Sequence, residues 1–481
     1  MKIVQIIQTD VQSDIVNELK SKRYLDQPDI GKAAKELDPI QHDVFDKRLR
    51  PDKKVKIDAE DGGNKIITVD ENEAGFRYEK VARIAVSLQK LIVKRAVAFL
   101  FGNPVEVNAE PVGDKQKLVL KALNRILYDV KSKSLNRRVA RQVMSCTEVA
   151  ELWYPVERES SDYGFKSKYK LRVAVFSPLL GDELYPYFDE SGDMVAFSRA
   201  FTRTDSKNTK HTYFETYTDE EHMLWEAGAT GFTPVEKYPR PIAIGKIPVV
   251  FANQPSVEWE DVQGLIDRLE KLLSNFADTN DYHASPKIFV TGTVTGFSKK
   301  GEAGAIIEGD EKATAQYLAW ANAPESVKLE IETLLRLIYT LTQTPDIAFD
   351  SVKGMGAISG IALKLLFMDA HLKVADHKEV FDEYMQRRVN VIKAFIGKFD
   401  TTLAVDCDAL QIEPEIVPYM VDDEKTRIEL ITMANGNKPV ISQKLSAKLA
   451  QLSQDSEADY IQMQAEAKAE NTFSLGEPTD A

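Results

Sequence analysis

The sequence has 481 residues, of which 43% are hydrophobic, and carries a formal net charge of −13 with an isoelectric point near 5.2. This length and composition allow roughly two to four domains with sizeable cores, which excludes a disordered chain. The acidic balance argues against a surface that coats nucleic acid, because such surfaces use Lys and Arg to displace the counterions of phosphates.

The sequence indicates a reducing, cytoplasmic setting. Its two cysteines, Cys146 and Cys407, lie far apart and are interpreted as small buried side chains rather than as a disulfide. The start of the chain is interrupted by Asp10 and Asp14 and lacks the apolar segment of a signal peptide. No stretch approaches the ~18 apolar residues of a membrane span.

The first half of the chain alternates between helical and strand-like patterns. Residues 1–50 are mixed and charged and end in the run KRLRPDKKVK, which is typical of a solvated surface. Apolar residues at helical spacing predict a helix over 78–100, stopped by Gly102 and Pro104. Two more helices are predicted over 115–127 and 134–149. From 151 to 248, short β-like runs separated by Gly, Asp, Ser and Asn predict an antiparallel sheet.

The middle of the chain has the pattern helix, small β insert, helix, loop, long helix. The first two helices are predicted over 256–282 and 327–341, each with one apolar stripe and charged remaining faces. A glycine-rich loop within TPDIAFDSVKGMGAISGIALKLLF precedes a long helix predicted over 361–399. Because long loops without secondary structure are uncommon inside a compact domain, we expect this loop to be functional.

The C-terminal part is predicted to be mainly helical. Past Thr401 the runs TTLAVD and LQIEPEIV predict two short strands, and helical patterns follow around 423–434 and 442–452. The end, 455–481, is rich in Glu, Gln and Ala and is predicted to fray into a polar tail.

The motifs of common enzymes are missing from the sequence. It contains no G-x-x-x-x-G-K-[ST] phosphate loop and no G-x-S-x-G nucleophile motif. No two of its six histidines are four residues apart; His371 and His377 lie six apart and are interpreted as surface or packing residues rather than metal ligands. We therefore expect no catalytic residue, no metal site and no cofactor, and a protein that is not an enzyme.

Three stretches carry a recognisable pattern: RIAVSLQKLIVKRAVAFLFGNPVEV; the succession VQGLIDRLEKLLSNF, LIYTLTQTPDIAF and SGIALKLLFMDAHLKVADHKEVF; and ANGNKPVISQKLSAKLAQLSQDSEADYIQMQAE. Together they resemble the portal (head–tail connector) family of tailed double-stranded-DNA bacteriophages, in its long-tailed, Gram-positive-phage-like branch. The resemblance covers residues 83–466. Residues before Tyr78 depart from the family pattern, and so does Gly356-Ala357-Ile358, where the family carries Asn or Phe.

The resemblance implies an α+β phage portal fold in a ring oligomer, typically dodecameric, around a DNA channel. Its implied parts are a wing (1–255), a stem helix (256–284), a small α/β clip (285–324), a second stem helix (325–343), a tunnel loop (344–360), a long spine helix with wing strands (361–421), a helical crown (422–470) and a flexible tail (471–481).

The resemblance also implies roles for individual residues. The implied tunnel-loop residues facing DNA are Asp350, Ser351, Val352, Lys353, Gly354, Met355, Gly356 and Ala357. The implied lining of the stem and channel is Asp261, Asp267, Glu270, Lys271, Asp278, Lys328, Glu332 and Arg336. The implied clip interface is Phe297, Ser298, Lys299 and Lys300. A ring of Lys353 side chains in contact with phosphates and a solvated loop lysine are equally compatible with the sequence, and Ser298 to Lys300 also fit an exposed hairpin turn.

The resemblance finally implies a function in the virion. The ring would sit at one capsid vertex, be assembled in the host cytoplasm, and serve as a conduit for DNA entry during packaging and exit during ejection. The implied partners are copies of the chain, double-stranded DNA, the large terminase subunit, a head–tail adaptor protein, and the major capsid and scaffolding proteins, with no membrane. The acidic charge of the chain would keep DNA from adhering to the channel. Two other functions stay open: a cytoplasmic helical scaffold, and a subunit of a nucleic-acid-processing enzyme with dispersed active residues.

Overall fold

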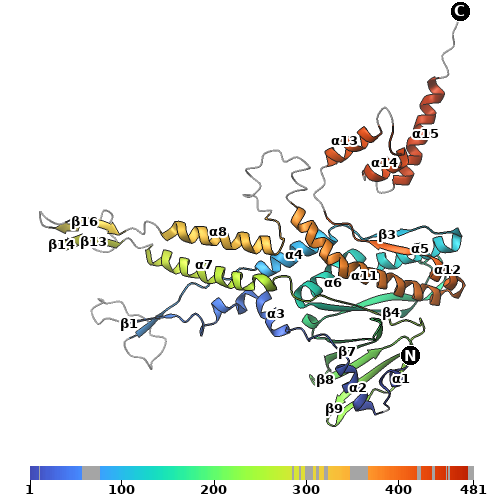
Figure 1. Cartoon of the computed structure of the whole chain (residues 1–481), viewed down its shortest axis with the longest axis horizontal. Coiled ribbons are helices and arrows are strands. Elements are labelled where there is room, and N and C mark those ends of the chain that lie inside the picture. The colour runs from blue at the N-terminus through green and yellow to red at the C-terminus, as the bar shows by residue number, and fades with distance from the viewer. Residues whose placement is uncertain are drawn as a thin grey trace, which may run out of the picture. The chain divides into compact units, whose positions relative to one another are not determined.

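The computed structural model describes residues 1–9, 11–56, 76–283, 287–291, 294–297, 307–309, 314–318, 323–346, 367–419, 424–435, 439–450, 452 and 456–474. The chain forms two compact units (Figure 1). Unit 1 comprises Met1–Asp346 and Asp369–Tyr419, and unit 2 comprises Ile347–Met368 and Met420–Ala481.

Two antiparallel sheets form the β part of unit 1. The larger has the order β10–β9–β8–β7–β6, with β11 also paired to β9, and the smaller has the order β12–β4–β5. Their strands are β4 Glu148–Ser160, β5 Ser167–Phe176, β6 Glu183–Phe188, β7 Met194–Thr204, β8 Lys210–Tyr217, β9 Glu221–Gly228, β10 Gly231–Pro234, β11 Arg240–Pro241 and β12 Val249–Asn253. The antiparallel sheet predicted over 151–248 is confirmed.

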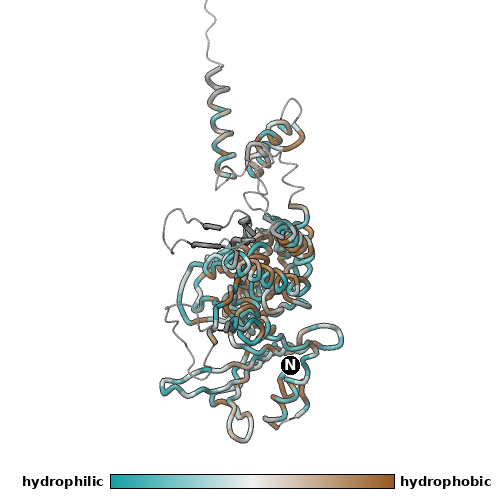
Figure 2. Tube along the Cα trace, turned by 90° about the vertical axis from the view of Figure 1, so that its left-hand side faces the viewer, coloured by the Kyte–Doolittle hydropathy of each residue, from teal (hydrophilic) through white to brown (hydrophobic). Residues whose placement is uncertain are grey.

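The two sheets share an apolar core. Leu184 and Phe197 of the larger sheet form one buried cluster with Ala150 and Phe251 of the smaller sheet. The opposite face of the larger sheet is covered by the N-terminal helices α1 Ile3–Ile7 and α2 Gln12–Ser21, whose buried residues join Phe214 and Trp225 in a second cluster. In Figure 2 the apolar positions of unit 1 lie mainly in its interior and the polar positions mainly at its edge. The alternation of apolar and polar residues along the strands therefore supplies both cores.

Four helices contribute many further buried residues to unit 1: α4 Leu88–Phe101, α5 Gly113–Asp129, α6 Ser132–Cys146 and α11 Met368–Phe399. The rings of Phe101 on α4 and Phe381 on α11 meet edge to face, with centroids 5.3 Å apart. The helices predicted over 115–127 and 134–149 are confirmed as α5 and α6. The long helix is confirmed from Met368; residues 361–366 lie outside the described part of the chain.

Two predictions of local structure in unit 1 are wrong. The predicted helix over 78–100 begins only at Leu88, because β2 Phe76–Glu79 and a segment without helix, 80–87, precede it. TTLAVD forms the 3-10 turn η5 Thr401–Leu403 and the helix α12 Ala404–Ala409 instead of a strand. The Asp400 carboxylate accepts a hydrogen bond from the Thr402 N–H and starts this turn, which outweighs the strand preference of Thr and Val.

Shorter elements complete unit 1. The LQIEPEIV strand is confirmed as β17 Ile412–Glu415, which pairs with β3 Glu106–Ala109. The N-terminal segment adds α3 Ile30–Leu37, the 3-10 turns η1 Pro39–Gln41 and η2 Asp43–Phe45, and the strand β1 Lys53–Lys56, which pairs with β2.

A pair of helices carries the small β insert. They are α7 Gln263–His283, preceded by the 3-10 turn η4 Glu260–Val262, and α8 Ala323–Leu341. Between them, β13 Lys287–Thr291 pairs with β16 Thr314–Leu318, and β14 Val294–Phe297 pairs with β15 Ile307–Gly309. Figure 1 shows the two helices side by side with the strands at their far end. The described part of the insert contains strands but no helix of its own.

Unit 2 contains α13 Glu424–Ala434, α14 Gln443–Ala450 and α15 Ser456–Ser474. The helices predicted around 423–434 and 442–452 are confirmed, whereas the tail predicted from 455 onward is helical as far as Ser474. Among the residues 428–435, 439–450, 452 and 456–469, Ser446 is the only buried one. Several of their large apolar side chains are exposed: Leu430, Met433, Val440, Leu452 and Ile461.

Candidate functional site

The apolar stripes of α7 and α8 hold the two helices together. Ile266 and Leu269 are buried on α7, and Leu334 and Ile338 are buried on α8, at intervals of three and four residues. This spacing places each set on one face of its helix. The Arg268 guanidinium also binds the Glu330 carboxylate across the pair at 2.6 Å, but both side chains are half exposed, so this contact adds little stability.

The outer face of α8 carries both charged and apolar side chains. Lys328 and Glu332 form an exposed ion pair one turn apart, at 3.7 Å. Leu329, Leu337 and Leu341, at multiples of four residues, are exposed at 66%, 41% and 57%. An exposed leucine stripe of this length is typical of a contact surface for another protein chain.

A polar face of α7 holds the extended segment 80–87. The Ala82 N–H donates to Asp278 Oδ1 at 2.7 Å, and the Ile84 N–H donates to Ser274 Oγ at 2.9 Å. The Val86 N–H donates to Glu270 Oε1 at 2.8 Å. Every second N–H group of the segment thus donates to a side chain of α7, and the three acceptor side chains are spaced four residues apart on that helix.

The spacing of these hydrogen bonds follows from backbone geometry. Four helical residues rise about 6.0 Å, and two extended residues span about 6.6 Å, so the two repeats nearly coincide. Arg50 closes one end: its Nη2 binds Asp278 Oδ2 at 2.6 Å, and its Nε donates to the Ala82 carbonyl at 2.8 Å. These side-chain partners replace the hydrogen bonds of a helix, which explains why residues 80–87 are not helical despite their apolar periodicity.

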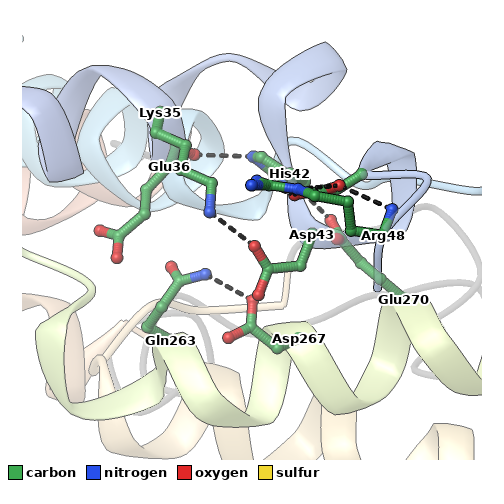
Figure 3. A network of polar contacts seen from close by, with 9 residues as sticks. Lys35, Glu36, His42, Asp43, Arg48, Gln263, Asp267 and Glu270 are labelled. Atoms are coloured by element: carbon green, nitrogen blue, oxygen red, sulfur yellow. Dashed lines mark hydrogen bonds and ion pairs between the residues drawn. The ribbon is translucent and has the colours of Figure 1, made fainter. Parts of the chain in front are cut away.

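Glu270 belongs to the interior of unit 1. Its side chain is 1% exposed, and Oε1 also lies 2.7 Å from Nδ1 of His42, which is itself buried (Figure 3). The expectation that Glu270 lines a channel is therefore wrong, because burial and two hydrogen bonds remove it from the surface. Asp278 is largely enclosed and paired with Arg50, so its charge is neutralised within the chain.

The remaining stem residues implied by the sequence are exposed. Asp261, Asp267 and Lys271 lie on the outer side of η4 and α7, and Lys328, Glu332 and Arg336 lie on α8. They comprise three acidic and three basic groups. Although the Asp267 side chain is exposed, partial desolvation and the nearby charges of Asp43 and Glu270 raise its pKa; the Gln263 amide donates to its Oδ1 at 2.8 Å. Over the described side chains of η4, α7 and α8, the exposed charged ones are six acidic and four basic, so the pair is net negative; they are Glu260, Asp261, Asp267, Asp281, Glu325 and Glu332 against Arg268, Lys271, Lys328 and Arg336.

A charged cluster fastens the end of α8 to α11. Lys373 Nζ donates to the Thr342 carbonyl at 2.9 Å, just beyond α8, and binds Glu258 Oε2 at 2.6 Å. His377 Nε2 lies 3.2 Å from Glu258 Oε1. Burial alone would raise the pKa of Glu258, but the hydrogen bond from His377 and the charge of Lys373 outweigh it and lower the pKa to about 2. The carboxylate is thus held ionised between two basic side chains.

Of the other implied site residues, only Phe297 lies within the described part of the chain. Phe297 ends β14, opposite Ile307, and Ser298, Lys299 and Lys300 lie outside the described residues. The tunnel-loop residues 350–357 also lie outside them. The described part of the chain holds no group of three His, Cys, Asp or Glu side chains placed to bind a metal ion. None of its helices combines the length and the apolar character needed to cross a membrane.

Sequence reasoning missed His42, Arg50 and the extended segment 80–87. Their partners on α7 lie about two hundred residues later in the chain, and no local pattern marks that pairing. The one signal in the sequence is the spacing of Glu270, Ser274 and Asp278, three polar residues at i, i+4 and i+8 that form a single polar stripe on a helix.

A protein-family model matches most of the chain. Residues 53–472 match the family model described as "Phage portal protein, SPP1 Gp6-like". This match begins thirty residues before the stretch in which the sequence resemblance was seen. No curated protein matches the sequence.

Several solved structures are similar to this chain at low sequence identity. A chain of the neck of an empty GTA particle, computed with C6 symmetry, has a TM-score of 0.41 and 10% identity, covering 76% of this chain and 89% of that one. A chain of the neck of the native GTA particle, computed with C12 symmetry, has a TM-score of 0.39 and 10% identity, with coverages of 76% and 88%. A chain of the virion of the native gene transfer agent (GTA) particle has a TM-score of 0.39 and 9% identity, with the same coverages.

Proposed function

The chain belongs to the SPP1 Gp6-like family of phage portal proteins, and on this premise we propose that it forms a dodecameric ring at one capsid vertex. The ring surrounds a channel through which DNA enters during packaging and leaves during ejection. Portal proteins are structural components of the virion, so energy for packaging comes from a separate ATPase, the terminase, which docks on the ring.

The observation that carries this proposal is the outer surface of α7 and α8. A closed ring needs two different surfaces on each subunit that fit each other. The exposed leucines Leu329, Leu337 and Leu341 supply apolar area that a neighbouring subunit would bury. The adjoining charged side chains stay in contact with water and face the channel.

The charges on this surface suit a conduit. Among the described side chains of η4, α7 and α8, six acidic and four basic ones are exposed and give the pair a net negative charge, and Lys328 and Glu332 partly neutralise each other. A polyanion would therefore be repelled rather than held, and contacts beyond about 8 Å are screened at physiological salt. This agrees in sign with the net charge of −13.

The ring is tested by replacing Leu337 with Glu and imaging purified full-length protein by negative-stain microscopy, with mass measured by light scattering. We expect wild-type rings with an axial hole and mostly smaller species for Leu337→Glu, with unchanged circular dichroism. The control is Val405→Glu, at a 79% exposed position on α12, which should leave the rings intact. Wild-type protein that forms no ring with a hole would refute the proposed function. Rings that persist in Leu337→Glu would refute only the role of the leucine stripe.

The loop and the insert are proposed contact sites for DNA and for other virion proteins. We assign residues 350–357 to a tunnel loop in which Lys353 makes transient contacts with phosphates, and Lys353→Glu should slow DNA packaging in vitro. Unchanged packaging would remove this role for Lys353. We assign Phe297, Ser298, Lys299 and Lys300 to the surface that binds the large terminase subunit and the head–tail adaptor. The major capsid and scaffolding proteins would contact the outer part of the ring.

A further inference from the structure

His42 lies where three segments of unit 1 meet. In the chain it lies between η1 and η2. Its Nε2 is 2.8 Å from the carbonyl oxygen of Glu36, at the end of α3. Its Nδ1 is 2.7 Å from Oε1 of Glu270, on α7. The same Glu270 oxygen accepts the Val86 N–H of the extended segment. Figure 3 shows His42 and Glu270 at the centre of this network, between α3 and α7.

The hydrogen-bond partners of His42 determine how many protons the pair holds. A backbone carbonyl only accepts, so Nε2 of His42 must carry a hydrogen. If His42 were neutral, Nδ1 would then present a lone pair to Glu270 Oε1, and a carboxylate oxygen at 2.7 Å would repel it. The pair is therefore either an imidazolium with a carboxylate or a neutral imidazole with a carboxylic acid. Both states hold one proton more than a neutral imidazole beside a carboxylate.

We propose that His42 and Glu270 form a proton-dependent latch, which fastens segment 80–87 and the corner from α3 to η2 onto α7 and loosens them as pH rises. When the shared proton leaves, the Glu270 carboxylate stays buried without a cationic partner, and a buried unpaired charge is costly. Opening the contact restores its hydration. This inference rests on unit 1 alone and does not depend on the proposed ring.

The surroundings of His42 favour the protonated state. Asp38 and Asp43 come from the same N-terminal segment, and Lys35 at α3 binds Asp43 at 2.6 Å. Asp267 faces the pair from α7, and Lys90 of α4 faces Asp38. Burial lowers the pKa of His42, but the hydrogen bonds to Glu270 and to the Glu36 carbonyl and the charges of Glu270 and Asp267 outweigh it and raise the pKa.

The sign of the pH dependence follows from this raised pKa. The unfolded or opened chain has the ordinary His pKa of about 6.5. The latch is therefore complete below about pH 6.5 and is lost as pH rises through the raised pKa of His42. Between these two pKa values the closed latch holds one proton more than the opened chain. The opening equilibrium should therefore increase by up to about tenfold per pH unit from about pH 6.5 up to the raised pKa, and level off above it.

Hydrogen–deuterium exchange of the full-length protein tests the latch. Peptides spanning 80–87 are followed by mass spectrometry between about pH 6 and about pH 9, with rates divided by the intrinsic rate at each pH. We expect the corrected opening of wild type to rise with pH. His42→Gln has no titrating ring, so its corrected opening should be independent of pH over the same range.

Two further variants separate the latch from general loosening. Ser274→Ala removes the acceptor of the Ile84 N–H and should increase opening by a similar factor at every pH, which keeps the wild-type slope. Glu270→Gln keeps an acceptor for the Val86 N–H and removes the buried charge, so it should abolish the slope, and it serves if His42→Gln does not fold. A wild-type protein without a slope would overturn the proposal. So would a wild-type slope that persists in Glu270→Gln.

Discussion

Replacing Arg388 with Met should be among the most destabilising single changes in unit 1. Arg388 on α11 binds Glu151 of β4 through two bonds, Nε to Oε1 at 2.6 Å and Nη2 to Oε2 at 2.9 Å. Arg388 is 2% exposed and Glu151 is fully buried. Without the guanidinium, Glu151 loses its charged partner and keeps the hydrogen bond from the Trp153 indole, at 2.9 Å.

The expected loss of unfolding free energy follows from leaving the Glu151 carboxylate buried without a cationic partner. Removing one partner of a buried ion pair costs about 3–5 kcal/mol, because the other charge stays desolvated and uncompensated. Met approximates the aliphatic part of Arg, so loss of packing contributes little. With a urea m-value of about 3 kcal/mol/M, the unfolding midpoint should fall by about 1 M or more.

A second substitution distinguishes the unpaired charge from lost packing. In Arg388→Met with Glu151→Gln, the amide at residue 151 is neutral and still accepts from Trp153. We expect the double variant to regain about 1–3 kcal/mol relative to Arg388→Met. The measurement is urea unfolding of full-length protein followed by circular dichroism. A double variant no more stable than Arg388→Met, or a single variant that costs less than about 1 kcal/mol, would refute the reasoning.

Three further substitutions test ion pairs that differ in how deeply they are buried. The pKa of Glu258 is lowered to about 2 from 4.5, so its contribution to the unfolding free energy is present above about pH 4.5 and is lost as pH falls toward 2. In Glu258→Gln the unfolding free energy, measured against pH, should therefore fall by roughly 3 kcal/mol less over this range than in wild type. Arg23→Met breaks the buried pair with Glu148 and should speed proteolysis within residues 1–25, whereas equal cleavage rates would show that other contacts hold this segment. Arg268→Ala removes the half-exposed pair with Glu330 and should change the unfolding free energy by less than about 1 kcal/mol; a larger loss would contradict the solvent screening assumed here.

Much of the fold could be predicted from local patterns. The helices α5, α6, α7 and α8 and the strands β5, β7, β8, β9 and β12 follow from apolar periodicity and turn residues, because each buries one face against a neighbour. The predictions failed where a distant side chain competes with local preference. Residues 80–87 have helical periodicity, but the polar stripe of α7 binds their amides, and Asp400 starts a helical turn in a strand-like run.

The candidate site was predicted less well for the same reason. Glu270 lies in a helix with many acidic residues, and nothing near it in sequence distinguishes it from the exposed Asp267 and Lys271. Its partner His42 is 228 residues away. The helical pattern predicted which residues belong to α7, but burial depends on the N-terminal segment that packs over it, which the sequence did not indicate.

The described helices of unit 2 bury few side chains, which links their folding to assembly. Among the residues of α13, α14 and α15 whose burial the structure describes, Ser446 is buried and the large apolar side chains are not, so little hydrophobic free energy offsets the entropy of ordering them within one chain. If this apolar surface is covered only when chains associate, the free energy of ordering is supplied by association and depends on protein concentration. The apparent melting temperature of this unit should then rise with protein concentration, while that of unit 1, with its own core, should change little.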